Sequence, residues 1–494
     1  MNAPAEFIVP PLKDPSLLKS HALIDGVWVE ADSGARFNVD NPADGSLVGS
    51  VPDMGTAETR RAIASCEAAL PAWRAMTAKA RCNLLKKWFE LILANADDLA
   101  AILTAEQGKP LAEAKGEINY GASFIEWFAE EAKRLYGDVI PGHMADKRLI
   151  VMKQPIGVTA AITPWNFPNA MITRKAGPAL AAGCTMVLKP AEQTPFSALA
   201  MAELALRAGI PKGVLNVVTG SLTSAPAIGQ ELCTHPTVRK LSFTGSTEVG
   251  RILMRQCADQ IKKLSLELGG NAPFIVFDDA DLDAAAEGLV QCKFRNAGQT
   301  CVSANRIYVQ AGVYDAFAQK FSERMAKLKV GRGTDAGVTV GPLIDEQGLA
   351  KVEAHLADAV SHGAKVLTGG KKHALGGRFF EPTVLTHVPM SAKVSCEETF
   401  GPIAPLIQFS SEDEVVRLAN ATEFGLAAYF YSRDLGRVFR VAEAIETGMV
   451  GVNTGIISNE VAPFGGVKQS GLGREGSKYG IEDYVEIKYV CISV

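Results

Sequence analysis

Apolar positions change their spacing along the chain. Between residues 56 and 136 they recur every three or four positions, which predicts helices. The run Gln107-Gly108-Lys109-Pro110 interrupts this pattern, and a new helix is predicted over 111–135. The first 50 residues instead carry short apolar runs between turn-forming pairs such as Asp25-Gly26, which predict a few short strands.

Beyond residue 148, short apolar runs alternate with stretches of helical spacing. This alternation predicts parallel sheets covered by helices on both faces. A first series ends near Gly269-Gly270 and a second follows it, so the chain is predicted to form two α/β domains with a boundary near 268–272. The predicted strands are 157–162, 185–188, 214–218, 240–243, 263–266, 272–277, 306–309, 366–368, 404–408, 427–431 and 449–452.

The composition narrows the class of protein. Of 494 residues, 47% are hydrophobic and 21% charged, and the net charge of −4 excludes the strongly basic surface of most nucleic-acid-binding proteins. No run of 18 apolar residues occurs, so we expect neither a transmembrane helix nor a membrane partner. The first 18 residues contain Glu6 and Asp14 but no Arg, and we expect no leader peptide and a cytoplasmic location.

The nine cysteines are scattered and include no Cys-x-x-Cys pair. This pattern indicates a reducing compartment and mostly buried thiols, of which one or two at most are reactive. The seven histidines form no His-Glu-x-x-His motif, and no Cys/His spacing typical of zinc occurs. We therefore expect no metal site.

One Gly-x-Gly-x-x-Gly motif runs from Gly471 to Gly476. A dinucleotide-binding motif of this kind must follow a strand and open a helix. The preceding residues, 464–470, do not predict a strand. We therefore do not assign the cofactor to this motif.

A better phosphate site lies at 243–250, where a predicted strand ends and a helix begins. Gly245 permits a tight turn, and Ser246 can cap the helix, whose free N–H groups suit a pyrophosphate. Lys189 and Glu192 follow another predicted strand end and could hold ribose hydroxyls, and Glu192 would repel a 2′-phosphate. A plain strand-to-helix turn and an exposed ion pair are the open alternatives.

Three further residues suggest covalent chemistry. Cys301 follows Gly298-Gln-Thr in a predicted loop, where a thiol can be exposed, whereas Cys292 lies within a predicted helix. Glu267 is an isolated carboxylate in an apolar stretch and could act as a general base. Asn166 lies in a proline-locked loop and could stabilise an oxyanion. An inert thiol, a paired structural acid and a turn-forming Asn remain the alternatives.

Together these motifs resemble those of the NAD(P)-dependent aldehyde dehydrogenases. The motifs that carry the resemblance are, in chain order, TPWNFP, KPAEQTP, FTGSTEVG, LELGGNAP, GQTCV, EETFGP and PFGGVKQSG. The resemblance extends from about residue 20 to the end of the sequence. The resemblance implies that Cys301 is the nucleophile, that Asn166 and the Cys301 backbone N–H bind the oxyanion, and that Glu267 activates the hydrolytic water. Lys175 is implied to assist proton transfer.

The resemblance also implies a cofactor, NAD, with NADP as a second possibility. Lys189 and Glu192 would hold the adenine ribose, Gly245 and Ser246 the pyrophosphate, and Glu398 the nicotinamide ribose. Glu192 stands where NADP-preferring bacterial members carry a small residue, which favours NAD. The implied cofactor-binding residues are Thr163, Trp165, Asn166, Lys189, Pro190, Ala191, Glu192, Gly245, Ser246, Glu267, Leu268, Glu398 and Phe400.

Three residues resemble the carboxylate-binding set of succinate-semialdehyde dehydrogenases: Arg174, Arg295 and Ser458. Phe167 and Phe464 complete the implied substrate site. Two guanidiniums suit a carboxylate, so the expected substrate is an anionic semialdehyde. Succinic semialdehyde is the first choice. Glutaric semialdehyde, one methylene longer, is the alternative because one methylene discriminates weakly. A helix-face ion pair is the other interpretation of Arg295.

The resemblance further implies an organisation into two Rossmann-like open-sheet domains and a small β arm. The expected NAD-binding domain comprises 1–135 and 157–268, and the expected catalytic domain comprises 269–479. The arm, 136–156 with 480–494, is expected to pack against neighbouring subunits of a homotetramer or homodimer. Ser303 stands where some relatives carry a second cysteine, so a disulfide switch there is not expected.

Two other classes of function stay open. A cysteine hydrolase could use the same nucleophile, oxyanion donors and base to cleave esters without a cofactor. A non-catalytic protein of this fold would be free to lose Cys301 or Glu267, and both are present.

Overall fold

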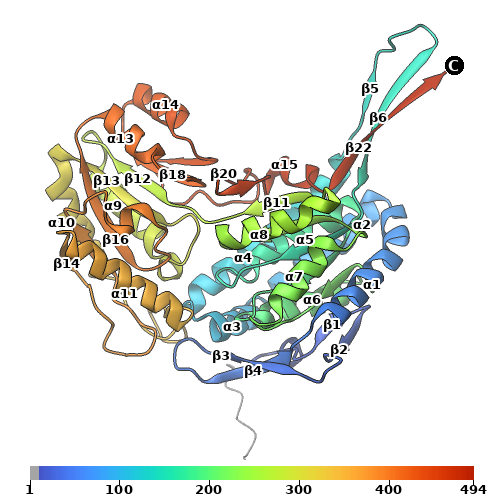
Figure 1. Cartoon of the computed structure of the whole chain (residues 1–494), viewed down its shortest axis with the longest axis horizontal. Coiled ribbons are helices and arrows are strands. Elements are labelled where there is room, and N and C mark those ends of the chain that lie inside the picture. The colour runs from blue at the N-terminus through green and yellow to red at the C-terminus, as the bar shows by residue number, and fades with distance from the viewer. Residues whose placement is uncertain (1–10) are drawn as a thin grey trace, which may run out of the picture.

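The computed structural model describes residues 11–494 as two lobes, each built on one sheet, and a projecting arm (Figure 1). The expected absence of a leader peptide and the expected start of the NAD-binding domain concern residues 1–10 and so lie partly outside the described residues. Among residues 11–494, no helix is long and apolar enough to cross a membrane, and no group of His, Cys, Asp or Glu is arranged to hold a metal.

The first lobe contains an eight-stranded sheet in the order β2-β1-β9-β8-β7-β10-β11-β21. The five central strands are parallel, whereas β2, β1 and β21 join the edges antiparallel. The strands are β1 (Ala22–Ile24), β2 (Val27–Val29), β7 (Val158–Ile162), β8 (Thr185–Lys189), β9 (Leu215–Val217), β10 (Val238–Thr244), β11 (Lys263–Glu267) and β21 (Gly471–Leu472). Of the central strands, β8 and β9 are buried along their whole length and β10 at all but one residue, as is typical of parallel strands covered on both faces.

Helices cover both faces of this sheet (Figure 1). The predicted break after the N-terminal helices is confirmed, because Gly108 adopts a left-handed φ of 91° and ends α3. The helices are α1 (Thr56–Ala75), α2 (Ala78–Ala94), α3 (Ala96–Gln107), α4 (Leu111–Glu131), α5 (Ala170–Ala182), α6 (Pro195–Arg207), α7 (Ala225–Thr234) and α8 (Thr247–Cys257).

The second lobe contains a seven-stranded sheet in the order β14-β15-β16-β13-β12-β18-β19, parallel except at β14. The strands are β12 (Ala272–Val276), β13 (Ala304–Gln310), β14 (Lys365–Thr368), β15 (Thr383–Thr386), β16 (Ile403–Phe409), β18 (Ala427–Tyr431) and β19 (Met449–Val452). Its helices are α9 (Leu282–Phe294), α10 (Tyr314–Met325), α11 (Glu346–Ser361), α12 (Lys393–Cys396), α13 (Glu412–Asn420) and α14 (Leu435–Ala444). The predicted fold class, two Rossmann-like sheets, is confirmed. The sequence prediction missed β15, which has only four residues.

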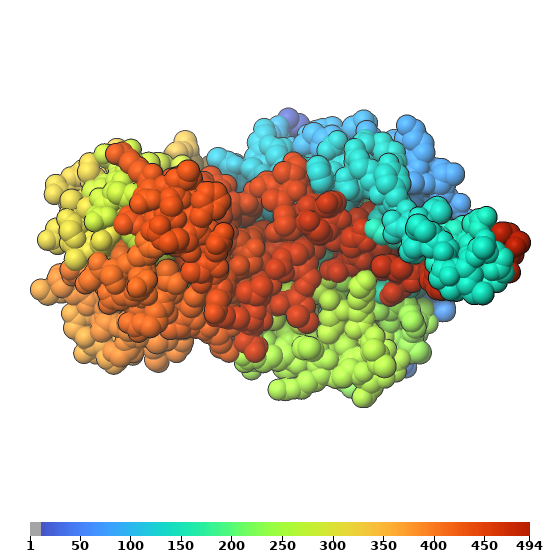
Figure 2. Space-filling view, turned by 90° about the horizontal axis from the view of Figure 1, so that it is seen from above, coloured from blue at the N-terminus to red at the C-terminus, as the bar shows by residue number. Residues whose placement is uncertain are grey.

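The arm consists of β5 (Asp138–Ile140), β6 (Lys147–Pro155) and β22 (Val485–Ser493), and the C-terminus lies at its tip (Figure 1). Between the lobes the chain returns through β20 (Val467–Lys468), β21 and α15 (Ser477–Glu482). Figure 2 shows this C-terminal stretch crossing the middle of the molecule. The smaller elements are β3 (Arg36–Asp40), β4 (Leu47–Pro52) and β17 (Phe424–Gly425).

Candidate functional site

A cavity of about 360 Å³ lies at the carboxyl edge of the first sheet, where it faces the second lobe. Strands β7, β10 and β11 end there, so the loops that follow them converge, as expected for a parallel sheet. The predicted site residues that line the cavity are Trp165, Asn166, Phe167, Gly245, Ser246, Glu267, Leu268, Cys301, Glu398 and Phe400. Segments distant in the sequence therefore meet at one place.

The second lobe contributes Cys301 through a strained loop. Asn296, Ala297 and Gly298 have φ values of 52°, 55° and 78°, a left-handed conformation that costs free energy in the two non-glycine residues. The loop lies against Gly270, where an added Cβ would be 2.8 Å from the Cys301 carbonyl oxygen. Only glycine permits this approach, which brings the Cys301 loop against the end of the first sheet.

Asn166 lies directly against this loop. Its side-chain Nδ2 donates a hydrogen bond to the Gln299 carbonyl at 3.1 Å, and its own carbonyl accepts one from Asn296 Nδ2 at 3.0 Å. Asn166 is 6% exposed. The structure thus places an amide donor and a thiol, from opposite lobes, in the wall of one cavity.

Glu267 ends β11 and is buried, and neither of its carboxylate oxygens has a hydrogen-bond partner among the described residues. Burial raises the pKa of Glu267 well above its ordinary value, and the nearby Glu475 raises this pKa further. Gly465 packs so closely that an added Cβ would lie 2.9 Å from Oε1 of Glu267. The carboxyl group is therefore held in place by packing and remains available to accept a proton.

The two cysteines of this region differ in position more than in acidity. Burial raises the pKa of the Cys301 thiol to about 12, against the opposing charge of Arg174, and burial raises the pKa of Cys292 to about 11. Cys292 donates a weak hydrogen bond to the Val302 carbonyl, whereas Cys301 faces the cavity with Asn166 and Glu267. Location, and not intrinsic thiolate character, distinguishes the candidate nucleophile.

Lys175 and Arg174, neighbours on α5, converge on Glu475. Lys175 Nζ donates to Glu475 Oε1 at 2.5 Å and to Thr244 Oγ1 at 2.7 Å, and Arg174 Nε lies 2.7 Å from Glu475 Oε2. Burial opposes ionisation of Glu475, but the two cations outweigh it and lower its pKa. Glu475 lies inside the Gly471–Gly476 motif, and no local pattern in the sequence marks it as the partner of Lys175 and Arg174.

The predicted substrate residues are divided between two places. Arg295 and Ser458 line a narrow pocket with Cys292 and Tyr429. Within residues 11–494, Arg295 has no carboxylate partner at ion-pair distance, and its guanidinium stacks 5.0 Å from the Phe167 ring. The guanidinium of Arg174 instead lies 3.9 Å from the Phe464 ring and shares the Glu475 carboxylate with Lys175.

Residues with cofactor-binding chemistry line the carboxyl edge of the sheet. Ser246 caps α8 by accepting the Val249 N–H at 3.3 Å. Lys189 Nζ lies 3.5 Å from Glu192 Oε2, and the Lys189 carbonyl accepts the Thr163 N–H at 3.1 Å. Pro190 and Ala191 connect the two charged residues. This arrangement brings a helix N-terminus and a Lys–Glu pair to neighbouring strand ends.

A second group faces the same cavity from the other lobe. Glu398 accepts the Gly270 N–H at 3.1 Å, and burial raises the pKa of Glu398 to about 7. Phe400, with a left-handed φ of 56°, packs edge-on against Trp165 at 5.5 Å. A strained non-glycine residue at a cavity wall is typical of a ligand-binding position.

Comparisons with known proteins place this architecture in a family. The model of the family described as "Aldehyde dehydrogenase family" matches residues 28–490. The chain belongs to the aldehyde dehydrogenase family. It is 70% identical to a glutarate-semialdehyde dehydrogenase of Pseudomonas aeruginosa, over 97% of this chain and 99% of that protein. It is also 70% identical to an NADP(+) succinate-semialdehyde dehydrogenase of Escherichia coli, over 98% of this chain and all of that protein.

A crystal structure of an Escherichia coli NADP-dependent enzyme superposes on this aldehyde dehydrogenase with a TM-score of 0.97, at 70% identity, covering 98% of this chain and all of that one. The resemblance inferred from the motifs is therefore confirmed at the level of the family. Aldehyde dehydrogenases use NAD(P), and the residues here fit such a group. The capped N-terminus of α8 suits a pyrophosphate, and the buried Glu398 and the Lys189–Glu192 pair suit ribose hydroxyls.

Several cavity residues of this aldehyde dehydrogenase were not anticipated. Thr244 ends β10, and a stretch around the start of α11 contributes Ile344, Asp345, Gln347, Gly348 and Lys351. Thr244 belongs to a motif that was recognised, so its position could have been inferred. The α11 residues come from a different segment of the second lobe and carry no local pattern that marks a site.

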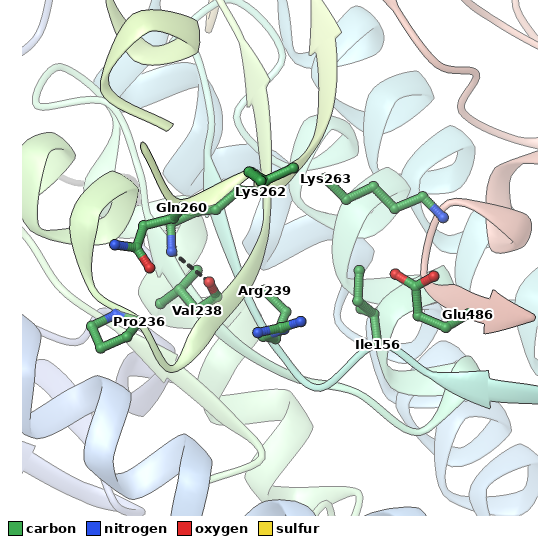
Figure 3. Close-up of a pocket in the computed structure, with 9 residues that line it drawn as sticks. Ile156, Pro236, Val238, Arg239, Gln260, Lys262, Lys263 and Glu486 are labelled. Atoms are coloured by element: carbon green, nitrogen blue, oxygen red, sulfur yellow. Dashed lines mark hydrogen bonds between the residues drawn. The ribbon is translucent and has the colours of Figure 1, made fainter. Parts of the chain in front are cut away.

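A second cavity of about 280 Å³ lies at the opposite, amino edge of the same sheet (Figure 3). Its walls include Ile156 before β7, Arg239 in β10, Lys262 and Lys263 at the start of β11, and Glu486 from the arm. None of the predicted site residues lies there. Lys262 Nζ donates to the carbonyls of His235 and Val238, so its charge is already satisfied within the fold.

Proposed function

We propose that this aldehyde dehydrogenase oxidises succinic semialdehyde to succinate, with NAD preferred as the cofactor. The observation that carries the proposal is the convergence of Cys301, Asn166 and Glu267 on one cavity, beside an Arg295 that lacks a carboxylate partner among the described residues. A nucleophile, an amide donor and a buried base are the groups that covalent aldehyde oxidation requires.

The proposed reaction begins at sulfur. The Cys301 thiol gives its proton to water, and the thiolate sulfur attacks the aldehyde carbon to form the oxyanion of a thiohemiacetal. Asn166 Nδ2 and the Cys301 backbone N–H donate hydrogen bonds to the oxygen, which carries the developing negative charge. Bound NAD(P) supplies the hydride acceptor for the oxidation. Departure of hydride from the former aldehyde carbon leaves a thioester on Cys301.

Hydrolysis completes the cycle. Glu267 accepts a proton from water, and the resulting hydroxide attacks the thioester carbon. The carbon–sulfur bond breaks, which releases the carboxylic acid and restores the Cys301 sulfur. Lys175, paired with Glu475 and close to Thr244, is proposed to assist the onward transfer of the Glu267 proton.

The substrate assignment depends on charge. Arg295 and Ser458 are proposed to bind the distal carboxylate, because a guanidinium without a carboxylate partner offers a bidentate site for one. Arg174, which is ion-paired with Glu475, and the Phe167 and Phe464 rings are proposed to shape the path from this carboxylate to Cys301. Glutaric semialdehyde is the second candidate, favoured by the Pseudomonas aeruginosa relative named for that substrate at equal identity.

The proposed preference for NAD rests on Glu192. Its carboxylate lies 3.5 Å from Lys189, and a 2′-phosphate at this ribose position would meet a negative charge. Bound NAD would be held by Lys189 and Glu192, by Gly245 and Ser246 at the start of α8, and by Glu398.

The arm is proposed to join subunits of a homotetramer or homodimer. Its strands leave large apolar side chains in solvent, including Val139, 82% exposed, and Ile487, 71% exposed. Such apolar exposure on a projecting sheet is typical of a subunit contact. We also propose that the arm comprises residues 136–156 and 480–494, the NAD-binding domain 1–135 and 157–268, and the catalytic domain 269–479, from which β21 crosses back to add an edge strand to the first sheet.

The test is NAD(P)H formation from succinic semialdehyde, glutaric semialdehyde and butanal, each with NAD and with NADP. A kcat/KM that is highest for succinic semialdehyde with NAD is expected. Equal use of butanal would contradict the carboxylate site, and a preference for NADP would contradict the role of Glu192. Ester cleavage that is faster than aldehyde oxidation would instead favour a cysteine hydrolase.

A further inference from the structure

A buried ion pair lies beneath the catalytic cavity. Lys109, at the break between α3 and α4, places its Nζ 2.6 Å from Glu117 Oε2, and each side chain is 1% exposed. Two buried charges carry a desolvation cost of several kcal/mol per ion, which is offset only by good geometry and additional hydrogen bonds. The partners of this pair therefore indicate what it holds in place.

Both partners of the pair bind the loop that carries Asn166. Lys109 Nζ donates to the Asn166 backbone carbonyl at 2.7 Å. Glu117 Oε1 accepts the N–H groups of Asn169 at 2.9 Å and Ala170 at 3.2 Å, where α5 begins. One ion pair thus fixes the loop at Asn166 and again a few residues later.

The same stretch of chain also binds the loop that carries Cys301. Glu113 accepts the Asn296 N–H at 2.8 Å, and Gln107 Nε2 donates to Asn296 Oδ1 at 2.9 Å. Asn296 Nδ2 then donates to the Asn166 carbonyl, which Lys109 already binds. Both lone pairs of that carbonyl are occupied, so rotation of the Asn166 peptide plane would break two buried hydrogen bonds.

Lys109 also contacts the next residue of the loop. Its Nζ lies 3.9 Å from the centre of the Phe167 ring, and the guanidinium of Arg295 lies 5.0 Å from the same ring. Cation–π contacts of this kind are strongest where water is excluded. The ring that lines the cavity next to Asn166 is therefore held by two cations.

We propose that Lys109, with Glu117, is a positioning residue that keeps the Asn166 amide aimed at the aldehyde oxygen. Neither Lys109 nor Glu117 lines the cavity, so Lys109 acts through the Asn166 backbone. The inference rests on the oxyanion role proposed above for Asn166.

The experiment is a double-mutant cycle. Lys109→Met alone would leave Glu117 buried without its cation, a change that can prevent folding. The variant to use is therefore Lys109→Met with Glu117→Gln, which removes both charges and leaves a carbonyl oxygen for the Asn169 and Ala170 N–H groups. It is compared with Asn166→Ala and with the combined variant, using butanal as well as the semialdehydes. Lys115→Met, on the exposed face of α4, the helix that carries Glu117, is the matched control.

The paired change should lower kcat about 10- to 100-fold, because a small misplacement of a catalytic donor has effects of that size. The cofactor dissociation constant and the thermal midpoint should match those of the Lys115→Met control. In the Asn166→Ala enzyme the paired change should have almost no further effect, since Asn166 no longer has an amide to position.

An equal fall of kcat in both backgrounds would overturn the proposal, as would an unchanged kcat in the folded paired variant. Failure of the proposed function has a different signature. If the wild-type enzyme oxidises butanal as well as the semialdehydes, the proposed carboxylate site is contradicted. The double-mutant cycle can still be measured with butanal as the substrate. If Asn166→Ala alone keeps the wild-type rate, the oxyanion role fails, and the positioning role fails with it.

Discussion

The strands of the first sheet begin at its amino edge and end at its carboxyl edge. The polar side chains at these two edges differ in whether they have hydrogen-bond partners. At the carboxyl edge, the Glu267 carboxylate has no hydrogen-bond partner among the described residues. At the amino edge, Lys262 and Lys263 both donate to backbone carbonyls. The cavities are similar in volume, about 360 and 280 Å³. Size alone therefore does not distinguish these two cavities, whereas the buried carboxylate without a partner at the carboxyl edge does.

The largest effect should come from the nucleophile. Cys301→Ala should lower aldehyde oxidation at least about 10³-fold, because the covalent intermediate can no longer form. Cys292→Ala should not abolish turnover, since that thiol lies in the neighbouring pocket. Steady-state NAD(P)H formation measures both. Equal losses in the two variants would contradict the assignment of Cys301.

Glu267→Gln should separate the two half-reactions. A burst of NAD(P)H followed by turnover slowed about 10²-fold is expected, because water is no longer activated for thioester hydrolysis. The base acts in its deprotonated form and its pKa is raised, so the wild-type hydrolysis rate should rise with pH through that pKa and fall on acidification. Rapid-mixing traces across pH test this prediction, and a variant that keeps the rising limb would exclude Glu267 as the base.

Arg295→Ala should raise KM for the semialdehydes about 10- to 100-fold, the effect expected for a lost charged hydrogen bond. Butanal oxidation should change little. Arg239→Ala removes a guanidinium at the amino edge and is the matched control. It should change neither KM for the semialdehydes nor the oxidation of butanal. A similar loss with butanal would mean that Arg295 supports the fold of the cavity and does not bind the carboxylate.

The smallest effect expected is a change of cofactor preference. Glu192→Ser should shift the ratio of kcat/KM for NADP over NAD by about tenfold, because one repulsive charge is removed at a partly exposed position. Glu486→Ser removes a carboxylate from the amino edge and should leave the ratio unchanged. An unaltered ratio in Glu192→Ser would show that this residue does not determine the preference between NAD and NADP.

Local patterns predicted the two sheets because buried parallel strands are short and continuously apolar. They also predicted Cys301, Glu267 and Asn166, each of which lies in a loop or strand end with a distinctive motif. Glu475 and Lys109 could not be found in this way. Their importance comes from partners more than 50 positions away, Lys175 for the first and Asn166 for the second, and no local spacing reveals such contacts.

The C-terminal stretch has a consequence for engineering this protein. From Glu475 to Ser493 it supplies the carboxylate that pairs with Lys175 and Arg174, then the short helix α15, and then strand β22 of the arm. A fusion partner at the end of β22 would lie on the projecting arm, whereas a deletion that begins before Glu475 would remove both the carboxylate shared by Lys175 and Arg174 and strand β22 of the arm. Removing this end therefore leaves two buried cations, Arg174 and Lys175, without their shared carboxylate, even though β22 itself lies at the periphery of the molecule.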